Sequence, residues 1–225
     1  MTKNPFALLI ILLFSFTAIK AQDSIYQIVN KQTCACITTK SGISFSLADY
    51  RNCLTQTLNR NSKLILAELK KTYPDSLSSY KKGYEYGQAV GSRLDTDLVY
   101  TCDAYFKIAD TLRAASYRVN NKDSLRQLLV DLNNPGITRD VMFYQRRALT
   151  NFLLGLQDDA DRDALEVFKQ NPSSIAALFI HASYLEANSK FAEAASLYYR
   201  LDKLTGEHAY LVSAAINNRK NRELH

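Results

Sequence analysis

The sequence predicts an all-α protein in which an array of helical hairpins packs on a disulfide-tied N-terminal helical bundle. Glycine and proline, the residues that interrupt helices, occur only seven and four times in 225 residues. Apolar residues recur at the three- and four-residue spacing of amphipathic helices along most of the chain. From residue 141 the sequence also repeats itself at a spacing of about 34 residues, which is typical of stacked helical hairpins.

The first 21 residues have the layout of a secretory signal peptide. Lys3 supplies the positive start, an apolar run covers residues 6–16, and Ala21 precedes the expected cleavage point. The run is shorter than the roughly 20 residues that span a bilayer as a helix. We expect export to the periplasm or the cell exterior, with no membrane span after cleavage; a retained N-terminal anchor is the alternative.

The charge of the remaining chain is modest and evenly spread. Residues 1–21 contain Lys3 and Lys20 and no acidic residue, so their removal lowers the formal charge from +6 to +4. The nearest approach to a basic cluster is the tail, residues 219–222. Because nucleic-acid binders concentrate positive charge on one face, we expect no nucleic-acid partner.

The four cysteines, Cys34, Cys36, Cys53 and Cys102, all lie in the N-terminal half. An even number of cysteines in an exported chain indicates disulfides, because that compartment is oxidising. Residues 24–40 are expected to form a helix, on which residues two apart point roughly 200° apart. A bond between the first two cysteines would therefore be strained. We expect one of them to bond Cys53 and the other Cys102, tying three helices together.

A metal site is the alternative use of these cysteines, because thiolates bind zinc and copper(I). No histidine lies near any of the four in the sequence, and neither a C-x-x-C redox pair nor a C-x-x-C-H haem-attachment motif is present. We expect no metal and no other cofactor. A metal- or small-ligand-binding protein that uses the cysteine- and tyrosine-containing half is kept as the alternative function.

The second helix has a clear start. Ser46 is followed three residues later by Asp49, as in a capping box, and apolar residues then recur at helical spacing. The polar residues 59–61 predict a bend or break in the middle, and Pro74 stops the pattern.

The third predicted helix carries Gly83, Gly87 and Gly91 on one stripe. Glycine costs nearly 1 kcal/mol relative to alanine inside a helix. We therefore expect another helix to approach this stripe closely. A ligand groove bordered by Tyr80 and Tyr84 is the alternative.

Two further helices are expected before the repeat. Thr96 is expected to start the first of them, and a short one follows from Ser124 until the Asn-Asn-Pro-Gly sequence at 133–136. The polar stretch 118–123 predicts the domain boundary, so that residues 22–118 form the cysteine-containing bundle and residues 119–225 form the array.

The N-terminal half resembles a group of uncharacterised secreted bacterial helical domains. The resemblance covers roughly residues 24–115 and depends on the C-x-C pair at Cys34, the helix with spaced glycines, and Cys102 followed four residues later by Phe106. It implies no known activity.

The repeat pairs Ala148 with Ala182, Ala160 with Ala194, and Tyr144 with Leu178. This period and this pattern of small and large residues resemble tetratricopeptide repeats, which stack helical hairpins in a right-handed array. The two units would cover residues 141–174 and 175–208. A helix over residues 208–218 is expected to cap the end.

The resemblance also implies a binding groove, because members of this family hold ligands along the first helix of each hairpin. Carried over to this chain, such a groove predicts a protein or peptide partner. Its expected residues lack the group of Lys, Arg and Asn side chains with which members of this family bind a peptide carboxylate. That Leu149 and Phe152 are simply core residues is the alternative. The expected partner-binding residues are Met142, Gln145, Leu149, Phe152, Phe179, Ser183 and Glu186.

No catalytic constellation is present, so we expect a binding protein and not an enzyme. The three histidines lie far apart in the sequence, and no nucleophile elbow, phosphate-binding loop or H-E-x-x-H motif occurs. The densest acidic cluster, within residues 158–163, is expected to mark the start of a helix, where negative charge is favourable. A calcium loop is the alternative, although its glycine and terminal glutamate are missing.

Overall fold

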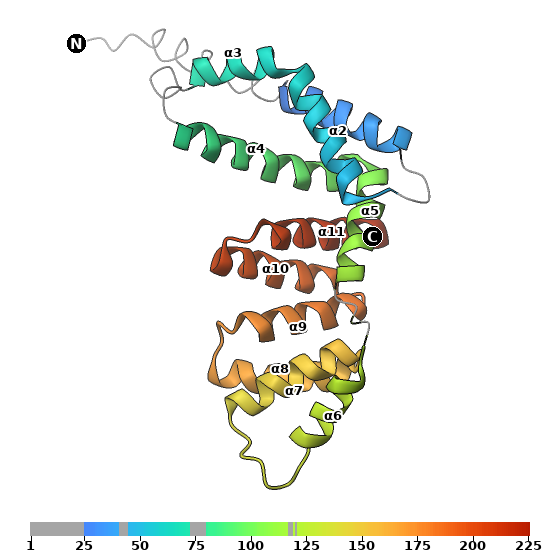
Figure 1. The fold of residues 1–225 in the computed structure, drawn as a ribbon, viewed down its shortest axis with the longest axis vertical. Helices are drawn as coiled ribbons and strands as arrows, with labels where there is room; N and C mark the ends of the chain where they lie inside the picture. Colours follow the sequence, from blue (N-terminus) through green and yellow to red (C-terminus); the bar gives the residue numbers. More distant parts are fainter. Residues whose placement is uncertain (1–24, 41–44, 73–79, 117–118, 120) are drawn as a thin grey trace, which may run out of the picture. The chain divides into compact units, whose positions relative to one another are not determined.

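A computed structural model describes residues 25–40, 45–72, 80–116, 119 and 121–225, and leaves out the side chains of residues 72, 80–89 and 116 (Figure 1). Within these residues every regular element is an α-helix, which confirms the predicted all-α class. The predicted signal segment, residues 1–21, lies outside them. Contacts divide the chain into two units, Met1–Tyr105 and Phe106–His225.

The N-terminal unit begins with a helix over residues 25–40. The predicted capping box is confirmed, because the backbone N–H of Asp49 donates to Ser46 Oγ and that of Ser46 donates to Asp49 Oδ2 at 2.9 Å. The predicted break is confirmed at Asn61, whose side-chain amide donates to the Thr57 carbonyl at 2.8 Å. The remaining helices of this unit are α2 (Leu47–Arg60), α3 (Ser62–Thr72), α4 (Tyr80–Thr101) and the first residues of α5 (Asp103–Ser116).

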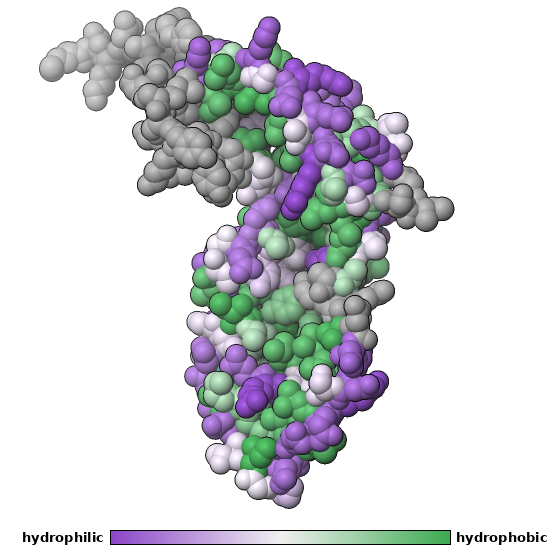
Figure 2. Space-filling view, viewed as in Figure 1, coloured by the Kyte–Doolittle hydropathy of each residue, from purple (hydrophilic) through white to green (hydrophobic). Residues whose placement is uncertain are grey.

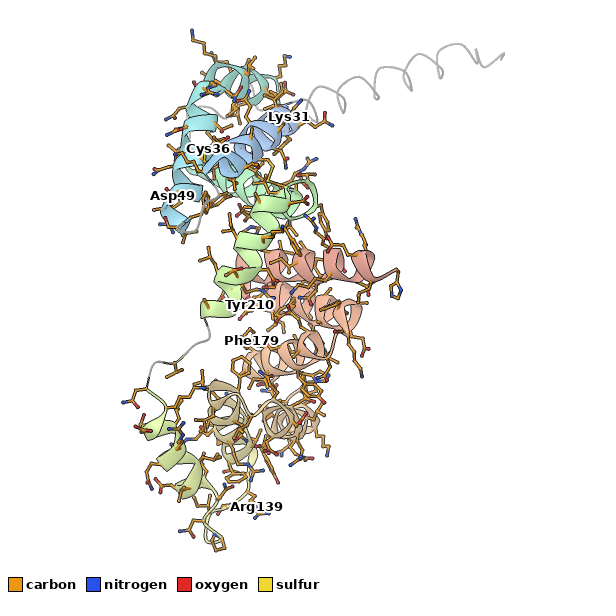
Figure 3. The ribbon with its side chains drawn as sticks, turned by 90° about the vertical axis from the view of Figure 1, so that its right-hand side faces the viewer. Lys31, Cys36, Asp49, Arg139, Phe179 and Tyr210 are labelled. Carbon is orange, nitrogen blue, oxygen red and sulfur yellow. A yellow bond between two sulfur atoms is a disulfide. The ribbon has the colours of Figure 1, made fainter. Side chains whose placement is uncertain are left out.

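Two disulfides cross-link this unit as expected, and Figure 3 labels Cys36 among its helices. Cys34 bonds Cys102, and Cys36 bonds Cys53, each with a Cα–Cα distance of 5.6 Å. The two neighbouring cysteines therefore face different helices, as the helical geometry predicts. The bonds connect the helix over residues 25–40 to α2 and to the end of α4.

Two sequence-based expectations for this unit are wrong. Thr96 does not start a helix, because α4 continues through it and its hydroxyl donates back to the Arg93 carbonyl at 2.8 Å. Close helix packing at Gly91 is also wrong, since a Cβ placed there would meet no atom of the described residues within 4 Å. The side chains at positions 80–89 lie outside the described set, so the alternative groove is not placed.

The C-terminal unit contains the rest of α5 and a series of helices that pack on their neighbours in chain order (Figure 1). The contacts join α6 to α7, α7 to α8, α8 to α9, α9 to α10 and α10 to α11, and α7 also contacts α9. The helices are α6 (Asp123–Leu132), α7 (Val141–Leu154), α8 (Gln157–Gln170), α9 (Ile175–Ala187), α10 (Phe191–Thr205) and α11 (His208–Leu224). The predicted final helix is therefore present and extends past residue 218.

The repeat spacing is visible in the helix starts. α7 begins at Val141 and α9 at its repeat equivalent, Ile175, and α8 and α10 begin at another equivalent pair, Gln157 and Phe191. The N-caps repeat as well. The side chain before α7 accepts a hydrogen bond from the backbone N–H of Phe143, and the side chain before α9 accepts one from the backbone N–H of Ala177. Each hairpin therefore starts from an equivalent local signal, because the capping side chain satisfies a backbone donor that the helix leaves open. The two capping residues are Asp140 and Ser174.

Two hydrophobic clusters hold these hairpins together. One joins α7, α8 and α9, the other joins α9, α10 and α11, and Phe168 and Phe179 pack against both. The paired small residues of the repeat are buried in these clusters, because a methyl side chain lets helices cross closely: Ala148, Ala160, Ala182 and Ala194.

Candidate functional site

Helices α7, α9 and α11 carry equivalent residues on one face. Positions 142, 145, 149 and 152 lie on one stripe of α7, because residues three, four and seven apart share a helix face. Shifting these positions by one and two repeat lengths gives matching stripes on α9 and α11. We call these residues the odd-helix face: Met142, Gln145, Leu149, Phe152, Ala176, Phe179, Ser183, Glu186, Tyr210, Ser213, Asn217 and Lys220.

An aromatic row makes this face continuous. The ring centroids of Phe152 and Phe179 are 5.4 Å apart, and those of Phe179 and Tyr210 are 6.4 Å apart. Distances in this range stabilise aromatic pairs beyond their burial. Figure 3 labels Phe179 on α9 and Tyr210 on α11 near each other. One ring from each of the three helices thus contributes to a single row.

The predicted groove residues differ in exposure. Met142 and Leu149 are exposed, at 57% and 46%, while Phe152 is buried in the cluster around α8. Phe152 is therefore mainly a core residue, as the alternative has it, whereas Leu149 is not. Gln145, Phe179 and Ser183 are partly buried, so their remaining surface is open to solvent.

Two clefts open on the odd-helix face, and together they contain five of the seven predicted residues. The neutral cleft, of about 540 Å³, takes Gln145 and Phe179, and the charged cleft, of about 720 Å³, takes Phe152, Ser183 and Glu186. Met142 and Leu149 line neither. The neutral cleft is lined by Gln145, Asn171, Ser173, Ser174, Ile175, Ala176, Phe179 and Tyr210. The charged cleft is lined by Arg113, Ala114, Val119, Lys122, Phe152, Leu153, Gly155, Gln157, Ser183, Glu186 and Ala187.

Glu186 lies at the centre of a polar network. Arg113 on α5 donates two bonds to its carboxylate, the Nη1 bond measuring 2.6 Å. Asn217 and Lys220 on α11 each donate to it at 3.1 Å, and the Tyr198 hydroxyl does so at 3.4 Å. The carboxylate therefore joins α5, α9, α10 and α11.

Asp110 completes the network from α5. Its Oδ1 accepts from Arg113 Nη2 and from Lys220 Nζ, both at 2.9 Å. The side chains of Arg113 and Glu186 are 14% and 12% exposed, so this pair is screened little by solvent. Helix α5 makes one more contact with α11, where the Arg219 guanidinium lies 4.2 Å from the ring centroid of Phe106.

The network shifts the pKa values of its members. Burial raises the pKa of the Glu186 carboxyl. The hydrogen bonds and positive charge of Arg113, together with Asn217 and Lys220, lower this pKa by more than burial raises it, so it lies below its ordinary value. Burial lowers the pKa of Arg113, whereas the bonds to Glu186 outweigh this and raise it. Both groups are therefore charged at neutral pH.

The sequence-based reasoning missed the residues that this site gains from outside the repeat. Arg113 comes from α5, and Lys122, at the start of α6, donates to the Leu154 carbonyl at 3.1 Å where α7 ends. A lysine near the last carbonyls of a helix is favoured by its dipole. On α11, Asn217 and Lys220 could have been found by continuing the repeat spacing into the capping helix, whereas no spacing in the sequence points to Arg113.

The acidic cluster belongs to α8 and is largely paired with neighbouring helices. Asp163 accepts two bonds from Arg147 at 2.6 and 2.7 Å, and Asp161 lies 2.6 Å from Nδ1 of His181. The pairing of His181 was not foreseen from the sequence. Within the described residues no group of three or more His, Cys, Asp or Glu side chains is placed to hold a metal ion.

In the N-terminal unit the four cysteines are all oxidised. Beside them, the Tyr50 hydroxyl donates to Asp95, and the ring centroids of Tyr50 and Tyr105 are 5.1 Å apart. Burial and the nearby Asp95 raise the pKa of both phenols. These tyrosines therefore stay protonated and hold α2 against α4 and α5.

Comparison with known proteins gives no relative. No protein-family model matches the sequence, and neither a curated protein nor a solved structure matches it. Among the helices that the structure describes, none is long and apolar enough to cross a membrane.

Proposed function

We propose that the protein is an exported, non-enzymatic binding protein whose tetratricopeptide-like array docks another protein or a peptide on the odd-helix face. One observation carries the proposal: Met142 and Leu149 are large, apolar and exposed, and they flank Gln145 of the neutral cleft. Ile175, 45% exposed, lies in the same cleft. Single exposed apolar residues are ordinary, whereas a group of them beside a cleft marks an interaction surface.

Figure 2 shows one face of the C-terminal unit. Hydrophobic residues gather on the visible face of the C-terminal unit at the level of α7–α9, with hydrophilic residues around them. An apolar centre with a polar rim is the usual anatomy of a protein interface.

The tetratricopeptide-like character of the array is supported by its register. Equivalent helix starts, N-caps and buried alanines all recur at the repeat spacing. The start of α6, Asp123, precedes the start of α8, Gln157, by the same spacing, and α6 packs on α7 as α8 packs on α9. Helices α7, α9 and α11 then supply three successive stripes, and stacked repeats of this kind form extended binding surfaces.

Export is supported by the cysteines. Two disulfides persist in an oxidising compartment and are rare in the cytoplasm. The alternative function, a thiolate metal site, is weakened by the same pairing, because a disulfide sulfur has no thiolate to offer. Cell fractionation followed by mass spectrometry of the protein tests export. A chain that starts at Gln22 in an extracytoplasmic fraction supports export, and a full-length chain confined to the cytoplasm contradicts it.

Capture from an envelope extract of the source organism tests the docking face. The bait is the mature chain, compared with M142D/L149D and with L165D, which changes a residue of α8 that is 40% exposed and outside the odd-helix face. We expect a discrete partner with the wild type and with L165D, and its loss with M142D/L149D. Equal capture by all three baits would contradict the proposal.

A further inference from the structure

We infer that the charged cleft is a second binding site, which takes a small molecule with an apolar body and one carboxylate. This goes beyond the docking of a protein on the exposed apolar residues and does not depend on it. The cleft has a volume of about 720 Å³, within the range of roughly 300–1,000 Å³ found for small-molecule sites. Its chemistry follows from which of its polar groups are already satisfied.

The acceptor at the centre of the cleft is saturated. A carboxylate offers about four lone-pair positions. Glu186 receives hydrogen bonds from Arg113, Asn217, Lys220 and Tyr198. A cationic ligand would therefore have to displace a bond that the chain makes with itself, so the cleft does not favour a cation.

The charges of the network also balance. Arg113 and Lys220 contribute two positive charges, and Glu186 and Asp110 contribute two negative ones, so the four together are neutral. Lys122 adds one further positive charge to the lining. No carboxylate pairs with Lys122 within the described part of the chain, since its contact there is the Leu154 carbonyl. The cleft thus carries a net positive charge.

Lys122 has donors to spare. An ammonium group has three N–H donors, and the Leu154 carbonyl uses one of them. The others can bind a carboxylate, a bond between charged groups that is stronger than a neutral hydrogen bond. Because the side chain is partly buried, water competes with this bond less than it would at an open surface.

The remaining lining selects the rest of the ligand. Phe152 and Leu153 form an apolar wall on α7, which suits a hydrocarbon or aromatic body.

A matched pair of ligands tests the assignment by calorimetric titration of the mature chain. 3-Phenyllactate has the apolar body and the carboxylate, and 3-phenyllactamide has the same size but lacks the negative charge. We expect the acid to bind with a dissociation constant on the order of 1 mM, as for a ligand of about twelve heavy atoms. The amide should bind about tenfold more weakly or not at all.

Variants of the lysine locate the bond. K122Q should remove the preference for the acid, K122R should retain most of it, and K107Q, which changes an exposed lysine of α5 outside the cleft, should leave it unchanged. Equal affinity for acid and amide in the wild type, the same preference in K122Q as in the wild type, or no binding of either ligand would each overturn the inference. If K122Q fails to fold, the wild-type comparison and K122R still decide.

Discussion

At the scale of single residues, Glu186 has a role that its position in the repeat does not reveal. The repeat places it on the odd-helix face, where the family resemblance predicts contact with a partner. In the folded chain its carboxylate is instead held by Arg113 and Lys220. A family pattern identifies the face of a helix, whereas the pairing of a charge depends on segments distant in sequence.

The Arg113–Glu186 pair should contribute strongly to stability. R113M removes the guanidinium and leaves a mostly buried carboxylate with Lys220 as its remaining cation. Removing one partner of a buried ion pair costs about 3–5 kcal/mol, because it leaves an uncompensated charge. Since Lys220 still compensates part of the Glu186 charge, we expect a loss of about 3 kcal/mol. Urea unfolding at pH 7 measures it, with R126M as the control, because Arg126 belongs to an exposed pair worth at most about 1 kcal/mol. Equal losses in the two variants would contradict the role of the network.

The lowered pKa of Glu186 predicts a pH dependence. Its pKa in the folded chain is below the ordinary value of 4.5. Between these two pKa values the folded state therefore binds fewer protons than the unfolded state. The stabilisation is complete above about pH 4.5 and is lost as the pH falls through the lower, folded value. The unfolding free energy of E186Q should therefore fall less between pH 5 and pH 3 than that of the wild type. E193Q, at an exposed site of α10, should follow the wild type; a wild-type slope in E186Q would exclude the effect.

At the scale of elements, the sequence predicted the helices whose ends carry a local signal. Ser46 and Asp49 form the predicted capping box, and the break at Asn61 lies where polar residues interrupt the apolar pattern. Thr96 gives an ambiguous signal, because a threonine hydroxyl can cap a helix or donate back within one. Here it donates to the Arg93 carbonyl, and α4 continues. The surrounding helix, which local sequence does not show, decides between the two.

The two disulfides should stabilise the N-terminal unit to different extents. They close loops with sequence separations of 17 and 68 residues, and longer loops lose more entropy when they are closed. Removing the shorter one in C36A/C53A should cost about 3 kcal/mol, and removing the longer one in C34A/C102A about 4 kcal/mol. Urea unfolding of both variants, with peptide mass spectrometry of the remaining bond, measures the difference. A Cys34–Cys36 linked peptide in the wild type would contradict the pairing.

The equivalent N-caps of α7 and α9 should contribute equally. D140A and S174A each remove the side chain that accepts from the third residue of its helix. Each should lower the unfolding free energy by about 1 kcal/mol. S173A, one residue before the second cap and exposed, serves as the control and should change it by less than about 0.5 kcal/mol. A silent S174A would show that the two hairpins do not start alike.

At the scale of the whole molecule, the repeat spacing leaves a pattern in the sequence, whereas pairings between distant segments do not. The repeat spacing is recognisable from small residues that must be buried wherever helices cross, so Ala148 and Ala182 reveal it. The polar stretch 118–123 predicts a boundary there, which stays a prediction for the domains. Contacts group the chain into two units that divide between Tyr105 and Phe106, and within the second unit Asp110 of α5 bonds to α11 and Arg113 of α5 bonds to α9. Such pairings across a long sequence distance leave no local pattern.

The central claim is that the odd-helix face binds another protein, and site-specific cross-linking in the living cell tests it most directly. A photoreactive amino acid is placed at Leu149 on the face and, as the control, at Leu165 on α8; both positions are exposed to a similar degree. We predict one discrete cross-linked product from position 149 and none from position 165. The same products from both positions, or none from position 149 in cells that export the protein, would contradict the claim.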